Sequence, residues 1–321
     1  MIDTSTCVSQ YFSKRVYIIP LIKFVVFLQC LSPLKKFYVV ISVYRHPMIY
    51  LLSLFFPAKK QKFYRFNDGS AVMADSIKTF YRAAVNKHIS LLKDKIWKYN
   101  YHGKGVILYT VDPVGPQIEV FQNDEYRFLN VKGKEVIDVG ANIGDTAIYF
   151  LLNFAKRVIA IEPYPANCEI IQKNLAINSI DDGKAIILNC AIGPRNLLNI
   201  SSDVINSGAQ ESVPSHKGTV IDVIPLSEVI SKYNLENAVL KMDCEGCEYD
   251  AILNESCKTL RFFVQMQIEY HYGDSLIKEK LETCGFTVKS TPPRFVPNIN
   301  VDHYMTLRGY IYASRNKYAD S

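Results

Sequence analysis

The sequence predicts an α/β protein: a doubly wound, mainly parallel sheet, preceded by an apolar, basic N-terminal extension and a small α+β lead-in. Two observations give this prediction. From residue 131 onward, short apolar runs alternate with helical patterns, and such runs are typical of parallel strands that are buried on both faces. The first of these runs ends in a glycine-containing turn, as the first strand of a nucleotide-binding sheet does.

Composition and charge exclude several classes of protein. The chain has 321 residues, of which 49% are hydrophobic and 21% charged, so it is neither fibrous nor disordered. Its formal net charge of +6 divides unevenly, because residues 1–66 carry +9 and residues 67–321 carry −3. A nucleic-acid-binding protein more often has its basic side chains on the working domain. We therefore expect no nucleic-acid partner.

The extension, residues 1–58, is apolar and basic: 31 of the 46 residues between 11 and 56 are apolar. No run reaches about 18 residues without a charge, the length that a spanning helix needs. Three interpretations stay open: a segment on a membrane surface or over the next domain, a spanning helix over residues 16–34, or translation that starts near Met48. We expect a cytoplasmic protein, with or without contact to a membrane surface.

The lead-in, residues 59–130, is predicted to mix strands and a helix. An Asp-Gly pair between apolar runs predicts a β-hairpin over residues 63–74. Apolar side chains at helical spacing predict a helix over residues 76–99. Short strands are expected at 106–111 and 118–121.

The main domain, residues 131–321, alternates strands and helices. Strands are predicted over 136–140, 157–162, 185–190, 219–223, 238–243, 262–269, 286–290 and 304–314. Helices are predicted over 145–154, 165–178, from 244 to about 253, and 275–284.

The turn after the first strand carries the pattern of a cofactor site. Gly140 and Gly144 supply the bare backbone that a bound ligand requires, although Asn142 stands where a dinucleotide site would have its second glycine. Asp138 precedes the turn and favours a cationic ligand, such as the sulfonium of S-adenosylmethionine, over a pyrophosphate. Glu162, at the end of the second strand, is placed to accept hydrogen bonds from ribose hydroxyls.

Two later strands are predicted to direct further polar side chains into the same crevice. Lys241, Asp243 and Glu245 alternate along one strand end, and Glu269 and His271 along the next. His271 is the natural base at neutral pH, and Asp243 is the alternative base or orients the acceptor. Lys241 would keep the carboxylates ionised. These groups are also ligands that suit Mg²⁺ or Mn²⁺, although we predict no metal.

The eight cysteines are too few for a disulfide scaffold, and most of them are expected to act as small buried hydrophobes. Cys244 and Cys247 form a C-x-x-C pair that resembles a redox motif. Because Asp243, Glu245 and Glu248 surround the pair and disfavour a thiolate, we interpret it as incidental.

Several blocks together resemble the FkbM-type S-adenosylmethionine-dependent methyltransferases, over about residues 131–314. The first block is residues 136–150, followed by Ile161-Glu162-Pro163-Tyr164-Pro165-Ala166-Asn167 with Asn174 and Asn178. A second block, residues 240–248, matches the family pattern K-x-D-x-E-G-x-E. Ile268-Glu269-Tyr270-His271 then matches I-E-x-H.

The resemblance implies a class I methyltransferase, Rossmann-like fold with a seven-stranded sheet. It implies S-adenosylmethionine as cofactor and a small-molecule or glycan acceptor that is methylated on a sugar or polyol oxygen. Cofactor-binding residues would be Asp138, Gly140, Asn142, Gly144, Asp145, Glu162 and Pro163, and catalytic residues His271, Asp243, Glu245 and Lys241. Two alternatives stay open: a nicotinamide-dependent oxidoreductase and a non-catalytic membrane-associated binding protein.

Overall fold

The computed structural model describes residues 62–65, 71–74, 89–93, 95–110, 116–200, 218–297 and 305–315. The chain divides into two compact units, residues 1–87 and 88–321. In the first unit, β1 (Lys62–Arg65) and β2 (Ala71–Ala74) pair antiparallel, which confirms the predicted hairpin. The three interpretations of residues 1–58 lie outside the described residues. None of the helices that the structure describes is long and apolar enough to cross a bilayer.

The second unit begins with an antiparallel sheet of β3 (Ile89–Lys93), β4 (Ile96–Tyr101) and β5 (Lys104–Tyr109). The helix predicted over 76–99 is therefore wrong from residue 89 onward, and its earlier part lies outside the described residues. Lys95, with a φ of 55°, lies in the turn between β3 and β4. After it, Trp97, Tyr99 and Tyr101 are buried at every second position. This period of two, which the apolar neighbour Ile96 obscures, is that of a strand.

The segment at 118–121 is also not a strand. It belongs to the short helix α6 (Pro116–Phe121), which buries Gln117, Val120 and Phe121. Pro116 favours this outcome, because proline is well suited to the first turn of a helix. The Phe121 ring packs on Tyr101, with 5.8 Å between ring centroids.

The main sheet confirms the predicted doubly wound fold. Its seven strands, numbered along the chain, lie in the order 3-2-1-4-5-7-6. Strands 1 to 5 are parallel to one another. Strand 7, which lies between strands 5 and 6, is antiparallel to both of them. The strands are β6 (Glu135–Val139), β7 (Arg157–Ile161), β8 (Ala185–Leu188), β12 (Ala238–Met242), β13 (Phe263–Tyr270), β14 (Phe286–Ser290) and β16 (Met305–Arg315).

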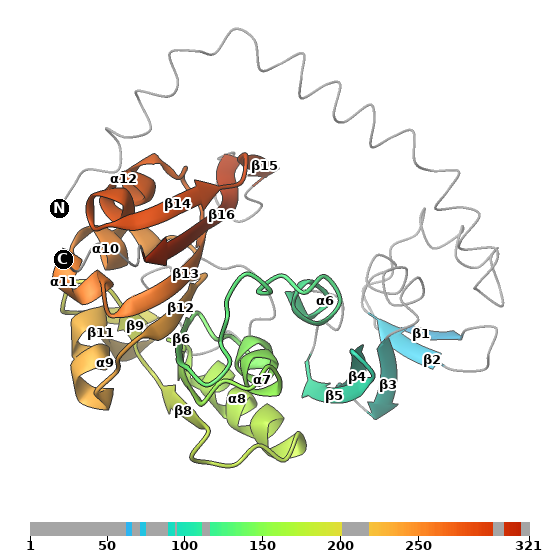
Figure 1. Ribbon diagram of the computed structural model, residues 1–321. Coiled ribbons are helices and arrows are strands. Elements are labelled where there is room, and N and C mark those ends of the chain that lie inside the picture. Colours follow the sequence, from blue (N-terminus) through green and yellow to red (C-terminus); the bar gives the residue numbers. More distant parts are fainter. Residues whose placement is uncertain are drawn as a thin grey trace, which may run out of the picture. The chain divides into compact units, whose positions relative to one another are not determined.

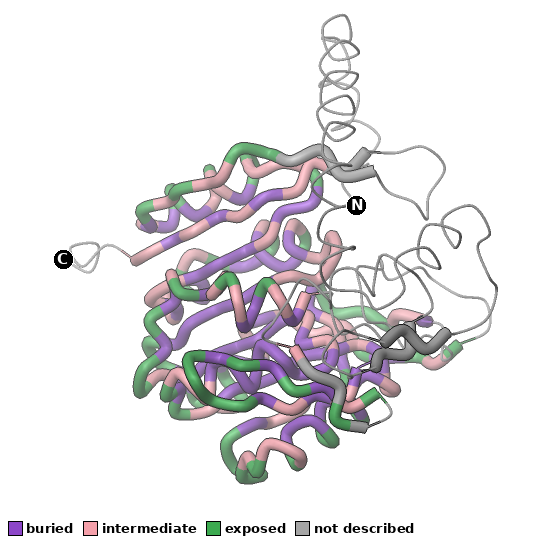
Figure 2. The backbone as a smooth tube through the Cα atoms, turned by 90° about the vertical axis from the view of Figure 1, so that its right-hand side faces the viewer, coloured by how far each residue is buried: buried purple, intermediate pink, exposed green. Residues whose placement is uncertain are grey.

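Helices cover both faces of this sheet (Figure 1). One face carries α7 (Asp145–Leu152) and α8 (Pro165–Ile177). The other carries α9 (Leu226–Tyr233), α10 (Glu248–Leu253), α11 (Cys257–Leu260) and α12 (Ser275–Thr283). Figure 2 shows that the buried residues are concentrated along the strands between the two layers.

Three short strands form a separate sheet beside the main one: β9 (Ala191–Ile192), β10 (Asn196–Ile200) and β11 (Thr219–Ile224). The strand predicted at 219–223 therefore does not join the main sheet. Only one of its residues, Ile221, is buried, unlike the fully buried strands β6 and β12. A further short strand, β15 (Arg294–Pro297), pairs with β16.

Four cysteines form two disulfides. This corrects the expectation that Cys257 and Cys284 are only buried hydrophobes, and the interpretation of Cys244 and Cys247 as an incidental pair. Cys257 on α11 is bonded to Cys284 after α12, and Cys244 is bonded to Cys247 after β12. The expectation holds for Cys168 and Cys190, which are free and buried.

The strand order locates the site. The chain proceeds from β6 outward to β7 and β8 and then returns to β12 on the other side of β6. At this reversal, the connections that leave neighbouring strands run to helices on opposite faces of the sheet. Ligands of such sheets bind in the crevice between these connections, outside the carboxyl ends of the strands. The glycine turn after β6 and the loop after β12 lie at this point.

Gly140 and Gly133 allow a matched test of the β6–β12 contact, because both have positive φ, 75° and 70°. A Cβ on Gly140 would lie 1.8 Å from the Asp243 carbonyl oxygen, whereas a Cβ on Gly133 meets nothing within 4 Å. Gly133→Ala should lower the free energy of unfolding by about 1–2 kcal/mol, the cost of the left-handed backbone. Gly140→Ala should cost at least about 2 kcal/mol more in urea unfolding, because the two strand ends must separate. Equal losses would contradict the close approach.

Candidate active site

The turn after β6 is built from residues with left-handed backbone. Gly140, Asn142 and Gly144 have φ values of 75°, 48° and 83°, and Gly144 is the N-cap of α7. A Cβ on Gly144 would lie 3.0 Å from the Ile171 side chain, so the glycine also lets α8 approach the turn. Asn174 of α8 donates a hydrogen bond to the Ile143 carbonyl, 2.9 Å away, and holds the turn from that side.

Asp138 and Lys241 form a fully buried ion pair beneath this turn. They are register partners on β6 and β12, with 3.0 Å between Lys241 Nζ and Asp138 Oδ1. Lys241 also donates to the carbonyls of Val139, at 3.1 Å, and Gly140, at 2.8 Å. Burial lowers the pKa of Lys241, but the carboxylates of Asp138 and Asp243 outweigh it and hold the pKa above its usual value.

These contacts differ from the sequence interpretation of both residues. Asp138 was expected to offer a free charge to a cationic ligand, yet Lys241 neutralises it and the Thr146 hydroxyl donates to its other oxygen at 2.5 Å. Lys241 is predicted to keep the carboxylates of the later strands ionised; its ion-pair partner is Asp138, and the charge of Asp243 also acts on it. Asp138 and Lys241 pair with each other because they lie opposite one another on neighbouring, fully buried strands. The spacing along the chain does not show which residues lie opposite one another.

Glu162, after β7, is buried and faces the same turn. It accepts hydrogen bonds from the backbone N–H of Asn142, at 2.9 Å, and of Tyr164, at 3.1 Å, and from Asn167 at 3.1 Å. Burial raises the pKa of Glu162 to about 7, although these donors oppose the shift. The carbonyl of Pro163 accepts a hydrogen bond from Asn189 at 2.7 Å, which fixes the loop that follows.

Of the buried oxygen atoms that make no hydrogen bond with a described residue, Asn142 Oδ1 belongs to the turn and Asp145 Oδ2 to the residue that follows it. Asp145 is the first residue of α7, and burial raises its pKa to about 6. Buried polar atoms normally have partners. Unsatisfied acceptors beside a glycine turn therefore fit a ligand that carries N–H and O–H donors, as the amino-acid and nucleoside parts of S-adenosylmethionine do.

The loop after β12, residues 243–247, carries the second half of the site. β12 ends at Met242, and Glu245 and Gly246 have φ values of 56° and 118°. The strand alternation expected to orient Glu245 therefore does not extend to it. The Glu248 carboxylate closes the loop by accepting hydrogen bonds from the N–H groups of Cys244, at 3.0 Å, and Gly246, at 2.8 Å.

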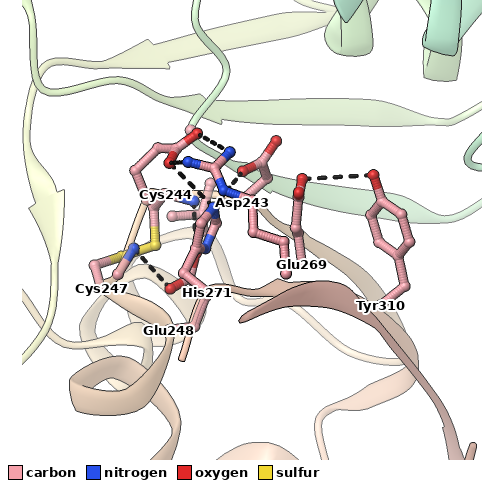
Figure 3. Close-up of polar contacts among 12 residues, drawn as sticks. Asp243, Cys244, Cys247, Glu248, Glu269, His271 and Tyr310 are labelled. Atoms are coloured by element: carbon pink, nitrogen blue, oxygen red, sulfur yellow. Dashed lines mark hydrogen bonds and ion pairs between the residues drawn. A yellow bond between two sulfur atoms is a disulfide. The ribbon is translucent and has the colours of Figure 1, made fainter. Parts of the chain in front are cut away.

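His271 lies between the carboxylates of Glu245, in this loop, and Glu248, the first residue of α10. Figure 3 shows the His271 ring beside Glu248. Its Nε2 is 3.1 Å from Glu245 Oε2, and its Nδ1 is 3.1 Å from Glu248 Oε1. Burial lowers the pKa of the imidazole, but the contacts and charges of these two carboxylates raise it to about 11. The two carboxylates therefore favour the imidazolium form of the ring, which does not suit the role of base that the sequence predicts for His271.

Asp243, Glu245, Glu269 and His271 do gather at one place, as the sequence predicts. Asp243 Oδ1 lies 4.0 Å from His271 Nε2, and the Asp243 side chain is 30% exposed. Burial, reinforced by the charge of Asp243, raises the pKa of Glu269 well above its usual value.

Three residues of this cluster escaped the sequence interpretation: Glu125, Arg308 and Tyr310. Arg308 contacts both oxygens of Glu245, at 2.8 and 3.3 Å, and the Tyr310 hydroxyl lies 3.5 Å from Glu269. The available signal was the period-two spacing of Arg308 and Tyr310 on the last strand, which pairs Tyr310 with Glu269. Burial raises the pKa of Glu125 to about 7, and Tyr310 hydrogen-bonds to it.

Within the described part of the chain, one group of side chains could hold a metal ion. Asp243, Glu248 and His271 each offer one ligand atom, and these atoms lie within 4.8 Å of one another. Glu248 already accepts two backbone hydrogen bonds and contacts the imidazolium, so its oxygens are engaged without a metal.

The fold and the site define a class: a doubly wound α/β protein with a glycine turn and an acidic cluster at the carboxyl edge of its parallel strands. The family model of the methyltransferase FkbM domain matches residues 138–311. The chain belongs to this family, which confirms the resemblance and the predicted cofactor, S-adenosylmethionine, and favours methyl transfer over the nicotinamide alternative. No curated protein matches the chain.

Solved structures similar to this chain include three methyltransferases. The FkbM methyltransferase of Methylobacillus flagellatus is 19% identical, with a TM-score of 0.39, over 56% of this chain and 43% of that chain. TYW2 of M. jannaschii, in complex with AdoMet, is 16% identical, with a TM-score of 0.37, over 72% and 92%. The precorrin-6y C5,15-methyltransferase of Geobacter metallireducens is 12% identical, with a TM-score of 0.36, over 61% and 89%.

The imidazolium of His271 can be tested by NMR. Because its pKa in the folded chain, about 11, exceeds the 6.5 of an unperturbed histidine, stabilisation by His271 is complete below pH 6.5 and declines as the pH rises toward 11. The ring ¹⁵N shifts should report an imidazolium from pH 6 to about 9, and Glu248→Gln should lower the midpoint. A wild-type midpoint near the ordinary value would contradict the assignment.

Proposed function

We propose that this chain transfers the methyl group of S-adenosylmethionine to a hydroxyl oxygen of a sugar or related polyol. The observation that carries the proposal is the position of Asp243. Its backbone packs directly on Gly140, in the glycine turn after β6 that we call the cofactor turn. Its partly exposed carboxylate lies in the acidic cluster, which Asp243, Glu245 and Glu269 form around His271. A hydroxyl held by this carboxylate would adjoin the cofactor crevice.

The cofactor would be held by residues around the glycine turn. Glu162 would accept hydrogen bonds from the ribose hydroxyls, and the unsatisfied oxygens of Asn142 and Asp145 would accept them from other donors of the ligand. Gly140 and Gly144 leave room for the backbone to approach it. When bound, S-adenosylmethionine supplies an electrophilic methyl group on a cationic sulfur. The Asp138–Lys241 pair would act indirectly, by holding the turn in place.

Asp243 is the residue best placed to accept the proton of the attacking hydroxyl. His271 cannot serve as base while it is an imidazolium, and Glu245 is engaged by both Arg308 and His271. His271 would instead be a positioning residue, which holds the loop through Glu245 and Glu248 and places a positive charge 4.0 Å from Asp243. Proton removal by a positioned carboxylate is general base catalysis.

The side chains around Asp243 suit a neutral acceptor rich in hydroxyl groups. Glu125, Glu269 and Tyr310 offer carboxylate and phenol oxygens that can accept or donate hydrogen bonds to several hydroxyls. The partly exposed Asp243 carboxylate would repel a polyphosphate backbone. We therefore favour a small molecule or glycan over a nucleic acid, and membrane-surface contact through residues 1–58 stays a prediction.

Asp243→Asn tests the function and the base together. With a panel of sugars and polyols as acceptors, the variant should lose at least about a hundredfold in kcat, because a base contributes 10²–10⁴-fold. Its affinity for S-adenosylhomocysteine, measured by calorimetry, should change little. Asp250→Asn is the matched control, since Asp250 is exposed on α10, outside the cluster.

Two results would overturn the proposal. Folded wild-type protein that gives no heat with S-adenosylhomocysteine would exclude the cofactor role. Methyl transfer from labelled S-adenosylmethionine to RNA, with none to any sugar or polyol, would exclude the acceptor class.

A further inference from the structure

The Cys244–Cys247 disulfide lies inside the loop after β12, residues 243–247, which we call the acidic loop. It closes residues 244–247, between Asp243 and Glu248. Cys247 is also the N-cap of α10, so the bond joins the end of β12 to the start of that helix. Figure 3 shows the disulfide beside Glu248 and His271.

The hydrogen bonds of the loop connect the disulfide to the acceptor side. The N–H of Cys244 and of Gly246 both donate to the Glu248 carboxylate, which contacts His271. His271 in turn contacts the carboxylate of Glu245, which is the residue between the two donors Cys244 and Gly246. The backbone of Glu245 has a left-handed φ of 56°, which a non-glycine residue adopts only when its surroundings impose it. The disulfide is one covalent part of those surroundings.

The two disulfides differ in burial at one of their four cysteines. Cys244, Cys247 and Cys257 are half-buried, whereas Cys284 is fully buried. Both residues of the Cys244–Cys247 pair are therefore partly exposed to a thiol in solvent, whereas in the Cys257–Cys284 pair only Cys257 is. Glu245 and Glu248 disfavour a thiolate at the reduced pair, so the pair is unsuited to act as a nucleophilic dithiol of the thioredoxin type.

We propose that Cys244–Cys247 is a thiol-reducible modification site that controls the order of the acidic loop, with the oxidised form as the active one. Reduction by a dithiol proceeds through a mixed disulfide: two electrons and two protons convert the bond to two cysteine thiols, and the dithiol becomes a disulfide. The loop then loses its covalent closure, and the contacts of Glu245 and Glu248 with His271 loosen. This regulation rests on the proposed function of the site, but its structural part does not.

The experiment uses the full chain with Cys257→Ser and Cys284→Ser, so that Cys244–Cys247 is its one disulfide among the described residues. The protein is treated with dithiothreitol or left oxidised, and alkylation with mass mapping reports the state of both thiols. Hydrogen exchange of the Cys244 and Gly246 amides reports loop order. Reduction should raise their exchange rates at least tenfold and lower methyl transfer by about ten- to a hundredfold, the cost of a misplaced catalytic group.

Further variants keep the outcome interpretable. Cys244→Ser with Cys247→Ser, in a chain that retains Cys257–Cys284, should reproduce the reduced state without reductant. Unchanged exchange in a chain whose Cys244 and Cys247 are shown to be alkylated would overturn the proposal, as would a disulfide that resists dithiothreitol in the folded protein. Activity that is equal or higher after reduction would also overturn it. Absence of S-adenosylhomocysteine binding in both states would refute the proposed function, while the exchange result would still decide the redox site.

Discussion

The buried ion pair between Asp138 and Lys241 is the interaction on which the rest of the site depends. It joins the two central strands at the point where the chain reverses its direction across the sheet. The same ammonium group binds the carbonyls of Val139 and Gly140, so it also determines where the cofactor turn begins. A buried charge without its partner is strongly destabilising, so neither residue tolerates loss of the other.

From this pair the site extends in two directions. On one side, unsatisfied oxygens and the Glu162 carboxylate lie at the turn from Gly140 to Gly144, where the proposed function places the nucleoside of the cofactor. On the other side, the backbone of Asp243 packs on Gly140 and introduces a loop that Glu248 and a disulfide hold together. Cofactor and acceptor would thus meet where two strand ends are in contact. The acidic loop is the part of this arrangement that depends on covalent closure.

The sequence predicted the main sheet and the gathering of Asp243, Glu245, Glu269 and His271, because buried parallel strands leave long apolar runs and end at a common edge. The apolar pattern predicted a helix over residues 89–99, where the structure has strands with alternating burial. It also predicted a strand over 118–121, where the structure has a helix that begins at Pro116. The sequence interpretation also misjudged roles that depend on cross-strand neighbours. Spacing along the chain does not reveal that Lys241 faces Asp138, that Glu245 and Glu248 enclose His271, or that Arg308 reaches Glu245 from the last strand.

A double-mutant cycle on Asp138 and Lys241 tests the central claim most directly. Asp138→Asn, Lys241→Met and the double variant are compared by urea unfolding. If the pair holds β6, β12 and the turn together, the free energy of unfolding of each single variant should be lower than that of the wild type by about 3–5 kcal/mol. The double variant should then lose less than the sum of these losses by at least about 2 kcal/mol. Additive losses would contradict the account, because the two residues would then stabilise the fold independently.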